Sequence, residues 1–448
     1  MSITLHIKKG LDLNIIGRPE GDPASAPYIT PKTIALIPDD FPGLTLKPVV
    51  KEGDSVKGGQ AVLADKRHPE IVLTSPAGGK IKAIVRGERR KLLRIEITPD
   101  ASATSFNIPL TASADAGGVK SALQSSGLWS MIRQRPYDIV AEPDKEPRDI
   151  YISTLDTAPL AGNFDAGLAK NSDLLEAGVA ALQKLTKGKV YVARREGSPI
   201  PDIKGAEMVN VGGPHPSGNP GVIIANTHPV NKGETVWTMD GLTLLRIGQL
   251  LSQNILSFET TIALTGSEVE NPGYIKTVIG ADIESITTGR IVKTGEHKRF
   301  ISGNVFTGDN VGPDGYLRNP YRQITVIPEG DDVTEFMGWA SISPKKMSVS
   351  RSFPGHFLHK LFNPDARLLG GRRAIIMSGE YDKVVPMDIM TEYLVKAILS
   401  RNIEQMEALG IYEIAPEDVA VAEYVCTSKM PLQSIIREGL EYLRKELE

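Results

Sequence analysis

The residues best suited to hold a small molecule lie in one short segment, VGGPHPSGNPG, at residues 211–221. Imidazole, hydroxyl and amide side chains are packed there between glycines and prolines, and each can form a hydrogen bond to a ligand. A turn-rich structural loop is the alternative interpretation. The candidate ligand-binding residues are Gly212, Gly213, His215, Ser217 and Asn219, with His228 nearby in the sequence.

The chain has only one thiol group for chemistry, because Cys426 is its single cysteine. No disulfide framework can form, and a four-iron cluster needs four thiolates. Cys426 lies in the segment APEDVAVAEYVCTSKMPLQ at 415–433, where a tight cluster-binding spacing would require three further cysteines. We therefore predict that Cys426 is a small buried apolar side chain.

A lysine that carries a prosthetic group would be a third kind of chemistry. The segment VKEGDSVKGGQAVLADKRHPEIVLTSPAGGKI, at 50–81, places glycine turns between short apolar runs. Its pattern partly recurs at 84–88, which predicts a pseudo-symmetric β-sandwich that resembles the biotinyl/lipoyl-like barrel. In carriers of that type the modified lysine sits at a hairpin tip, which here falls near Arg67, His68 and Pro69. Lys66 lacks the usual flanking residues, so we expect an unmodified module; a biotin- or lipoate-dependent carrier is the alternative.

Length and charge limit the class of protein. At 448 residues the chain should form about three domains. Its net charge of −3 argues against a general nucleic-acid binder. The start lacks the apolar run of a signal peptide, and no apolar stretch approaches the roughly 20 residues that span a bilayer. These features predict a cytoplasmic protein with no direct membrane span.

The strands and helices expected from the sequence pattern, which must position these side chains, indicate an α/β multidomain fold. A strand at 149–154, a helix at 172–185, further strands at 189–195 and 221–230 and a helix at 243–251 alternate as in a doubly wound sheet. The turn VENPGY at 269–274 is typical of a soluble-ligand-binding β-grasp (SLBB) domain. The predicted units are a biotinyl/lipoyl-like β domain (1–98), a linker (99–120), a Rossmann-like α/β domain (121–255), the SLBB domain (256–330) and a helical domain (331–448), with helices at 391–410 and 431–448.

A basic segment interrupts the last unit. Residues 345–373 hold seven Lys or Arg and one acid, Asp365, with three interleaved phenylalanines. Interfaces favour aromatic and arginine anchors, so we interpret the segment as a partner-docking surface and assign docking to Arg351, Phe357 and Lys360. The short turn around 356–362 should be too brief to bury all three rings. A solvated basic face is the alternative, and nucleic acid is disfavoured by the overall acidity.

The order of these units resembles one family. Together with the opening IKKGLDLNIIGRP (7–19), the segment at 211–221 and VCTSKMPL (425–432), it resembles the A-type subunits of the Na⁺-translocating NADH:quinone oxidoreductases, over essentially the whole chain. The C-type subunit of the Rnf complex and the NADH-binding subunit of complex I are similar in part. The resemblance implies a peripheral subunit on the cytoplasmic side of the bacterial inner membrane, held there by other subunits. The complex would use NADH and a quinone and export Na⁺.

Within such a complex, the residues favour a chain without its own electron carrier. Flavin-binding relatives cradle FMN with a glycine-rich loop, but the stretch SGLWSMIRQRPYDIV (126–140) carries bulky side chains there. The cluster positions of the relatives other than Cys426 fall on Pro416, Val419 and Ala422. We expect no tightly bound FMN, iron–sulfur cluster, biotin or lipoate, no metal site and no catalytic residue. The chain would support assembly and offer a quinone site at 211–221; a pure scaffold, or a subunit of an Rnf-like complex, is the alternative.

Overall fold

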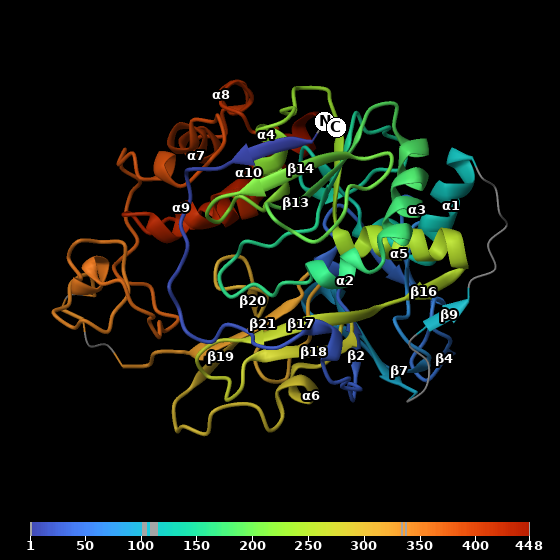
Figure 1. The fold of residues 1–448 in the computed structure, drawn as a ribbon, viewed down its shortest axis with the longest axis horizontal. Helices are drawn as coiled ribbons and strands as arrows, with labels where there is room; N and C mark the ends of the chain where they lie inside the picture. The colour runs from blue at the N-terminus through green and yellow to red at the C-terminus, as the bar shows by residue number, and fades with distance from the viewer. Residues whose placement is uncertain (1, 101–104, 108–114, 333–334, 337, 448) are drawn as a thin grey trace.

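The computed structural model describes all residues except 1, 101–104, 108–114, 333–334, 337 and 448 (Figure 1). Its largest sheet has seven strands in the order β1-β14-β13-β12-β15-β10-β11. The first five are parallel, and β10 runs antiparallel to β15. The strands are β1 (Ile3–His6), β10 (Arg133–Arg135), β11 (Ile139–Val140), β12 (Ile150–Ser153), β13 (Val190–Arg195), β14 (Glu207–Gly212) and β15 (Val236–Asp240).

Helices accompany this sheet as the strand–helix alternation predicts, since parallel strands need crossover connections. The central packing pair is α3 against α5, with α1 beside them. Asp115 caps α1 and Asp240 caps α5, each accepting a backbone N–H of the first turn. The helices are α1 (Ala116–Ser126), α2 (Asp165–Ala169), α3 (Ser172–Leu182), α4 (Pro220–Ala225) and α5 (Gly241–Gln253), with the 3₁₀ helices η4 (Leu128–Met131) and η5 (Gln183–Leu185).

Two small antiparallel sheets form the barrel-sandwich unit, in the orders β2-β8-β7-β4 and β3-β5-β6. Its hairpin tip joins β5 to β6 and is fixed by buried Asp65, which accepts the backbone N–H groups of Thr45, Arg67 and His68. The strands are β2 (Ile34–Leu36), β3 (Leu46–Pro48), β4 (Ser55–Val56), β5 (Ala61–Asp65), β6 (Val72–Thr74), β7 (Gly79–Arg86) and β8 (Leu92–Pro99), with η1 (Pro23–Ser25), η2 (Pro38–Asp40) and η3 (Glu88–Arg90) beside them.

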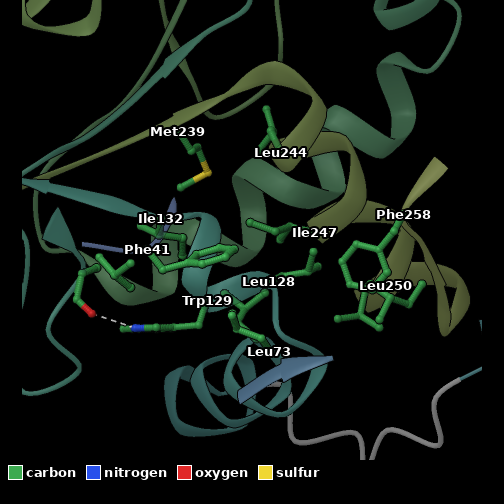
Figure 2. Packing of buried hydrophobic residues seen from close by; sticks show 14 of the residues in the cluster. Phe41, Leu73, Leu128, Trp129, Ile132, Met239, Leu244, Ile247, Leu250 and Phe258 are labelled. Atoms are coloured by element: carbon green, nitrogen blue, oxygen red, sulfur yellow. Dashed lines mark hydrogen bonds between the residues drawn. The ribbon is translucent and has the colours of Figure 1, made fainter. Parts of the chain in front are cut away.

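One hydrophobic core spans the barrel and the α/β domain (Figure 2). Phe41 and Leu73 of the barrel belong to the same cluster as Trp129, Ile247 and other side chains of the α/β domain. The indole N–H of Trp129 donates to the carbonyl of Ala141 at 2.8 Å, which satisfies its one polar atom in this core. The two units are therefore packed together as one body at this contact.

The SLBB unit is a five-stranded sheet in the order β18-β17-β21-β19-β20. The VENPGY turn joins β17 to β18, as the sequence predicts. The elements are β17 (Glu259–Thr265), β18 (Gly273–Val278), α6 (Ile283–Thr287), β19 (Lys298–Ser302), β20 (Asp309–Asn310) and β21 (Gln323–Pro328). A separate two-stranded pair, β9 (Ser105–Asn107) with β16 (Ile255–Ser257), lies beside α5.

The C-terminal unit packs around its own core, to which Leu394, Cys426 and Leu440 belong. Its helices begin at Thr391, later than the predicted helical unit. The preceding described residues from 331 form only the 3₁₀ helices η6 (Pro354–Phe357) and η7 (Tyr381–Lys383). The remaining elements are α7 (Thr391–Leu399), α8 (Ile403–Ala408), η8 (Pro416–Val419), α9 (Ala420–Val425) and α10 (Leu432–Leu447).

Several local predictions differ from the structure. The stretch 221–230 is not a strand: it begins as helix α4, and the missed strands β14 and β15 flank it. Helix α1 starts within the predicted linker, at Ala116. Strand β1, grouped in the sequence with the barrel, pairs with β14 in the α/β sheet because its apolar residues complete that sheet's edge.

Candidate functional site

A cavity of about 790 Å³ opens at the carboxyl ends of the parallel strands. Ser153 ends β12, Arg195 ends β13 and Asp240 ends β15, and all three line it. Strand order reverses at this point: β13 and β14 follow on one side of β12, whereas β15 lies on the other. Open α/β sheets bind their ligands at such a switch point. The barrel contributes Asp40 to the wall, the SLBB unit contributes Arg318 and the C-terminal unit contributes Glu417, so all four units meet here.

His215 lies in this cavity's wall, three residues beyond the end of β14. Its side chain is 3% exposed and is fixed from two sides: Nδ1 lies 3.1 Å from the hydroxyl of Thr157, and the ring stacks on Phe306. The other ring nitrogen, Nε2, is buried and has no hydrogen-bond partner among the described residues. Burial lowers the pKa of His215 to about 4, so the ring is neutral near pH 7.

The backbone around His215 is held by the opening segment of the chain. The carbonyl of His215 accepts the N–H of Leu11 at 2.8 Å, and its N–H donates to Asp12 at 2.9 Å. Gly10 allows this approach, because a Cβ there would lie 2.3 Å from the His215 carbonyl oxygen. The segment at 7–19 therefore positions the imidazole from outside the sheet.

The structure brings together only part of the predicted ligand set. His215 and Asn219 line the cavity, and the Asn219 amide donates to the carbonyl of Glu417 at 3.2 Å. Ser217 is buried and its hydroxyl donates to the carbonyl of Gly213, so it is already satisfied. Gly212 and Gly213 serve the backbone: a Cβ on Gly213 would lie 2.1 Å from the carbonyl oxygen of Ile7. The predicted position of this segment before a strand is wrong, since it follows β14 and precedes α4.

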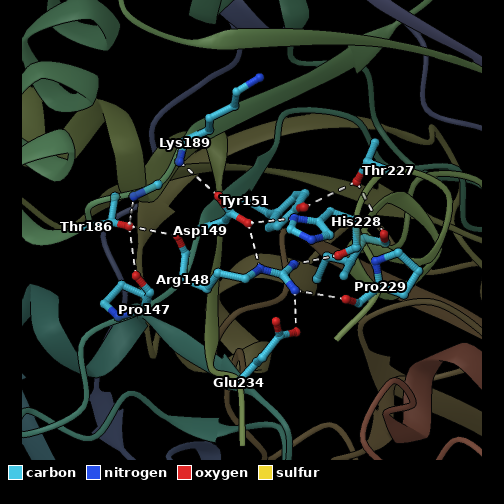
Figure 3. A network of polar contacts seen from close by, with 12 residues as sticks. Pro147, Arg148, Asp149, Tyr151, Thr186, Lys189, Thr227, His228, Pro229 and Glu234 are labelled. Carbon is cyan, nitrogen blue, oxygen red and sulfur yellow. Dashed lines mark hydrogen bonds and ion pairs between the residues drawn. The ribbon is translucent and has the colours of Figure 1, made fainter. Parts of the chain in front are cut away.

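His228 does not join this site. It lies near the amino end of β12, where its Nδ1 is 3.3 Å from Asp149, and Asp149 also pairs with Arg148 (Figure 3). Arg148 in turn donates to the carbonyls of His228 and Pro229 and pairs with Glu234. The network closes a loop at the end of the sheet opposite the cavity, which gives His228 a structural setting.

Two ion-paired clusters in the cavity wall connect the units. Buried Asp40 pairs with Arg318 and accepts the N–H of Asn319; burial raises the pKa of Asp40 to about 6 despite the guanidinium. Buried Arg135 pairs with Asp418 and Glu417, each at 2.9 Å. Burial beside Asp418 raises the pKa of Glu417 to about 7, and Arg135 partly offsets this. These contacts bind the barrel to the SLBB unit and the α/β domain to the C-terminal unit.

The stretch at 126–140, compared above with a flavin loop, is divided between core and cavity. Gly127 has a positive φ of 83° and ends α1, after which η4 places Trp129 in the core. Met131 and Arg133 line the cavity, and Arg135 forms the buried ion pairs already described. Bulky side chains thus occupy the positions where the resemblance implied glycines.

Cys426 is fully buried, with its sulfur 2.9 Å from the hydroxyl of Tyr381 and 3.3 Å from the N–H of Met430. The prediction that it is buried is confirmed. Across the described part of the chain, no group of three or more His, Cys, Asp or Glu side chains is placed to hold a metal ion. In the same residues, no helix combines the length and apolarity needed to cross a membrane.

The predicted docking residues lie at the surface, outside the cavity. Phe357 is 63% exposed, and Arg351 and Lys360 are exposed as well, with Lys360 5.2 Å from the ring of Phe362. The other two phenylalanines of the basic segment, Phe353 and Phe362, are buried. Part of its positive charge is compensated internally, because Lys346 and Arg367 both pair with Glu335 and Asp365.

Comparison with known proteins covers the whole chain. Family models match at residues 5–100 (NqrA N-terminal barrel-sandwich hybrid domain), 114–255 (NqrA second alpha/beta domain) and 261–312 (NQRA C-terminal domain). The A-type subunit of the Na⁺-translocating NADH-quinone reductase from Neisseria meningitidis serogroup B is 36% identical over 99% of this chain and 100% of its own length. Its counterpart from Serratia proteamaculans is also 36% identical, and that from Histophilus somni 34%, with the same coverage.

A solved structure of a NAD⁺-reducing [NiFe]-hydrogenase, in the air-oxidized state, is a distant match. It covers 49% of this chain and 47% of its own at 14% identity, with a TM-score of 0.36, and carries no weight for the fold or the site. The full-length relatives and the three family models agree with one another and with the observed order of barrel, α/β and SLBB units. The chain belongs to the NqrA family, the A-type subunits of the Na⁺-translocating NADH-quinone reductases.

Proposed function

We propose that this chain is a peripheral, cytoplasmic-side subunit of a bacterial inner-membrane complex that couples NADH oxidation and quinone reduction to Na⁺ export. The names of the full-length relatives support membership of such a complex. Within it, the chain contributes assembly surface and a binding site for the quinone head group, and does not itself carry electrons.

The observation that carries the quinone site is the unpartnered Nε2 of His215 in the wall of a large cavity. Gly218 donates its N–H to the hydroxyl of Thr157, and that hydroxyl can donate its own proton to Nδ1 of His215. The neutral ring then carries its proton on Nε2 and donates to a quinone carbonyl oxygen. Apolar side chains for a flat ring are present in the lining, among them Leu155, Leu168 and Met239.

A titration of the purified chain with a short-chain ubiquinone, followed by calorimetry, tests this site. Loss of one hydrogen bond to a buried partner should weaken binding by roughly 5–20-fold in His215→Phe, which keeps a flat ring without a donor. His228→Phe is the matched control and should bind as the unaltered chain does. Equal affinity in all three proteins would show that the quinone binds without His215, and no binding at all would leave the pure scaffold as the better description.

The docking surface is the second element of the proposal. We assign Arg351, Phe357 and Lys360 to contact with another subunit of the complex, since one exposed ring between two exposed cations fits the composition of protein interfaces. The relatives are themselves named as subunits, which supplies the class of partner.

A further inference from the structure

Four arginine side chains line the cavity without a neutralising carboxylate. Arg133, Arg195, Arg246 and Arg322 have no carboxylate oxygen within 4.0 Å in the described residues. By contrast, Arg318 and Arg437 line the same cavity and are paired with Asp40 and Asp138. Guanidinium groups that are removed from water are normally paired. Arg195, Arg246 and Arg322 all line the cavity at the carboxyl ends of the sheet; Arg322 lies near Arg246, and both Arg195 and Arg322 lie near Asp156.

Arg246 is the most deeply placed of the three. It projects from α5, is 6% exposed, and donates to the backbone carbonyls of Ser257 and Glu259 at 3.1 and 2.8 Å. In the described part of the chain, the hydrogen-bond partner of its remaining terminal nitrogen is the thioether sulfur of Met131 at 3.8 Å, a weak acceptor. Burial lowers the pKa of Arg246 to about 10; the nearby carboxylate of Asp240 opposes this shift, and the charge of Arg322 adds to it.

Arg322 and Arg195 are also short of acceptors. The Arg322 guanidinium lies 3.7 Å over the ring of Phe164 and donates from Nε to the carbonyl of Thr261. Its terminal nitrogens form no hydrogen bond within the described residues. Arg195 donates a hydrogen bond to the carbonyl of Asp156 at 2.9 Å, while its Nε is buried and has no hydrogen-bond partner among the residues that the structure describes. Both side chains therefore retain donors for an added group.

Acceptors in the same wall complement these donors. Asp156 is exposed and lines the cavity, and in the described residues neither Arg195 nor Arg322 has an oxygen of its carboxylate within 4.0 Å. Gln323 is 4% exposed, and its Oε1 has no hydrogen-bond partner among the described residues. A ligand that binds only through negative charge would leave these oxygens unsatisfied, whereas hydroxyl or amino groups would donate to them.

The usual backbone site for an anion is closed here. Asp240 caps the first turn of α5 by accepting the N–H of Thr243 at 2.7 Å, so a carboxylate already occupies that helix end. Guanidinium side chains are the remaining groups that can hold an anion at the switch point, and their forked N–H groups suit phosphate oxygens.

We propose that Arg195, Arg246 and Arg322 bind the phosphate group of a phosphorylated small molecule of nucleotide size, whose hydroxyl or amino groups donate to Asp156 and Gln323. The cavity volume of about 790 Å³ accommodates such a ligand. The three arginines line the same cavity as His215, and in the described residues none of them is hydrogen-bonded to that imidazole.

Calorimetric titration of the full chain with ADP, pyrophosphate and adenosine tests this inference without any variant. The expected order of affinity is ADP, then pyrophosphate, then adenosine, because only ADP uses both the guanidinium and the acceptor groups. Equal binding of adenosine and ADP would overturn the role of the arginines. Pyrophosphate binding as tightly as ADP would overturn the role of Asp156 and Gln323, and no binding of any probe at millimolar concentration would overturn the site.

Variants then test which residues bind the phosphorylated ligand. Arg322→Gln should weaken ADP binding about 10–100-fold, the loss of a charged hydrogen bond, and Arg322→Lys should recover part of it. Arg86→Gln removes an exposed arginine of the barrel and should change nothing. Thermal unfolding of each variant shows that it is folded. Unchanged ADP affinity in folded Arg322→Gln overturns the assignment.

Discussion

His215 is a residue whose charge the fold controls directly. Its pKa is lowered to about 4 from an ordinary value of 6.5, so the unfolded chain binds a proton at this ring between those values and the folded chain does not. We predict that this group contributes full stability above pH 6.5 and loses on the order of 3 kcal/mol as the pH falls towards 4. Urea unfolding across this range should show the loss.

The matched variant for this prediction is His215→Gln, whose amide can still bond to Thr157 but does not titrate. Other acidic and basic groups contribute equally to both proteins, so the difference between their stabilities isolates the ring. The difference should change through the window from pH 6.5 to 4 and stay constant above it. Parallel curves throughout would show that the ring is protonated equally in both states.

Cys426 supplies a second prediction for a single residue. Cys426→Ala removes a small buried group and the partner of the Tyr381 hydroxyl, so we expect a loss of about 1–3 kcal/mol in the free energy of unfolding. Electron transfer per assembled complex should stay unchanged. In a Tyr381→Phe background the same substitution should cost less, because no hydroxyl is left unsatisfied; a large loss of turnover in a normally assembled complex would instead indicate a redox role.

The sequence identified only some of the residues that line the cavity. The segment at 211–221 was found from its local composition, and His215 and Asn219 do line the cavity. His228 was predicted near the site because it is close in the sequence. Helix α4 separates it from the segment at 211–221, and His228 lies at the other end of the sheet. Arg246 and Arg322 carried no local signal: they come from two separate units and meet only through the tertiary fold.

At the scale of the element, the basic segment gives a prediction about assembly. Replacing Arg351, Phe357 and Lys360 together by Ser should leave the free chain folded, because none of them is buried. It should weaken retention on the membrane subunits by about tenfold or more, and more strongly at high salt, where the remaining charge pairs are screened. Co-purification across a salt series, with circular dichroism of the free chain, measures both.

The control for this surface replaces Lys51, Arg86 and Leu93 by Ser, two exposed cations and one exposed apolar residue of the barrel. It matches the change in charge and also removes an exposed apolar side chain, away from the basic segment. If the two triple variants are retained equally at every salt concentration, the basic segment is a solvated face and another surface makes the contact.

Helix α4 shows why one element was assigned wrongly. The run GVIIA is short, apolar and β-branched, a pattern that a buried strand and a buried helix share. Pro220 at the first helical position fixes the backbone for a helix, and Asn226 ends it after less than two turns. Longer elements with clear periodicity, such as α3, α5 and α10, were predictable because their apolar faces repeat over several turns.

At the scale of the whole molecule, we predict that the purified chain is colourless and has its unmodified mass. The hairpin tip is organised by Asp65 with no lysine in the carrier position, and side chains occupy the place of a glycine-rich flavin loop. Intact-mass spectrometry and an absorbance spectrum measure this directly. A biotinyl or lipoyl adduct, or stoichiometric flavin or iron–sulfur bands, would contradict it.

The order of units was predictable because each has its own strand and helix periodicity, whereas the way the units join was not. Asp40 with Arg318 and Arg135 with Asp418 connect residues about 280 positions apart. Such long-range pairs leave no periodic pattern in the sequence, and the same is true of the core shared by the barrel and the α/β domain.

The pairing of β1 with β14 has a consequence for synthesis on the ribosome. Ile3 is made early, but its partner Val209 is made 206 residues later. At about 5–20 residues per second, the first strand must wait roughly 10–40 s, while the barrel between them can already fold. During this interval its unpaired edge and the segment at 7–19 are open to chaperones and proteases. The His215 loop, which that segment fixes, can therefore form its final contacts only after β14 has been made and has paired with β1.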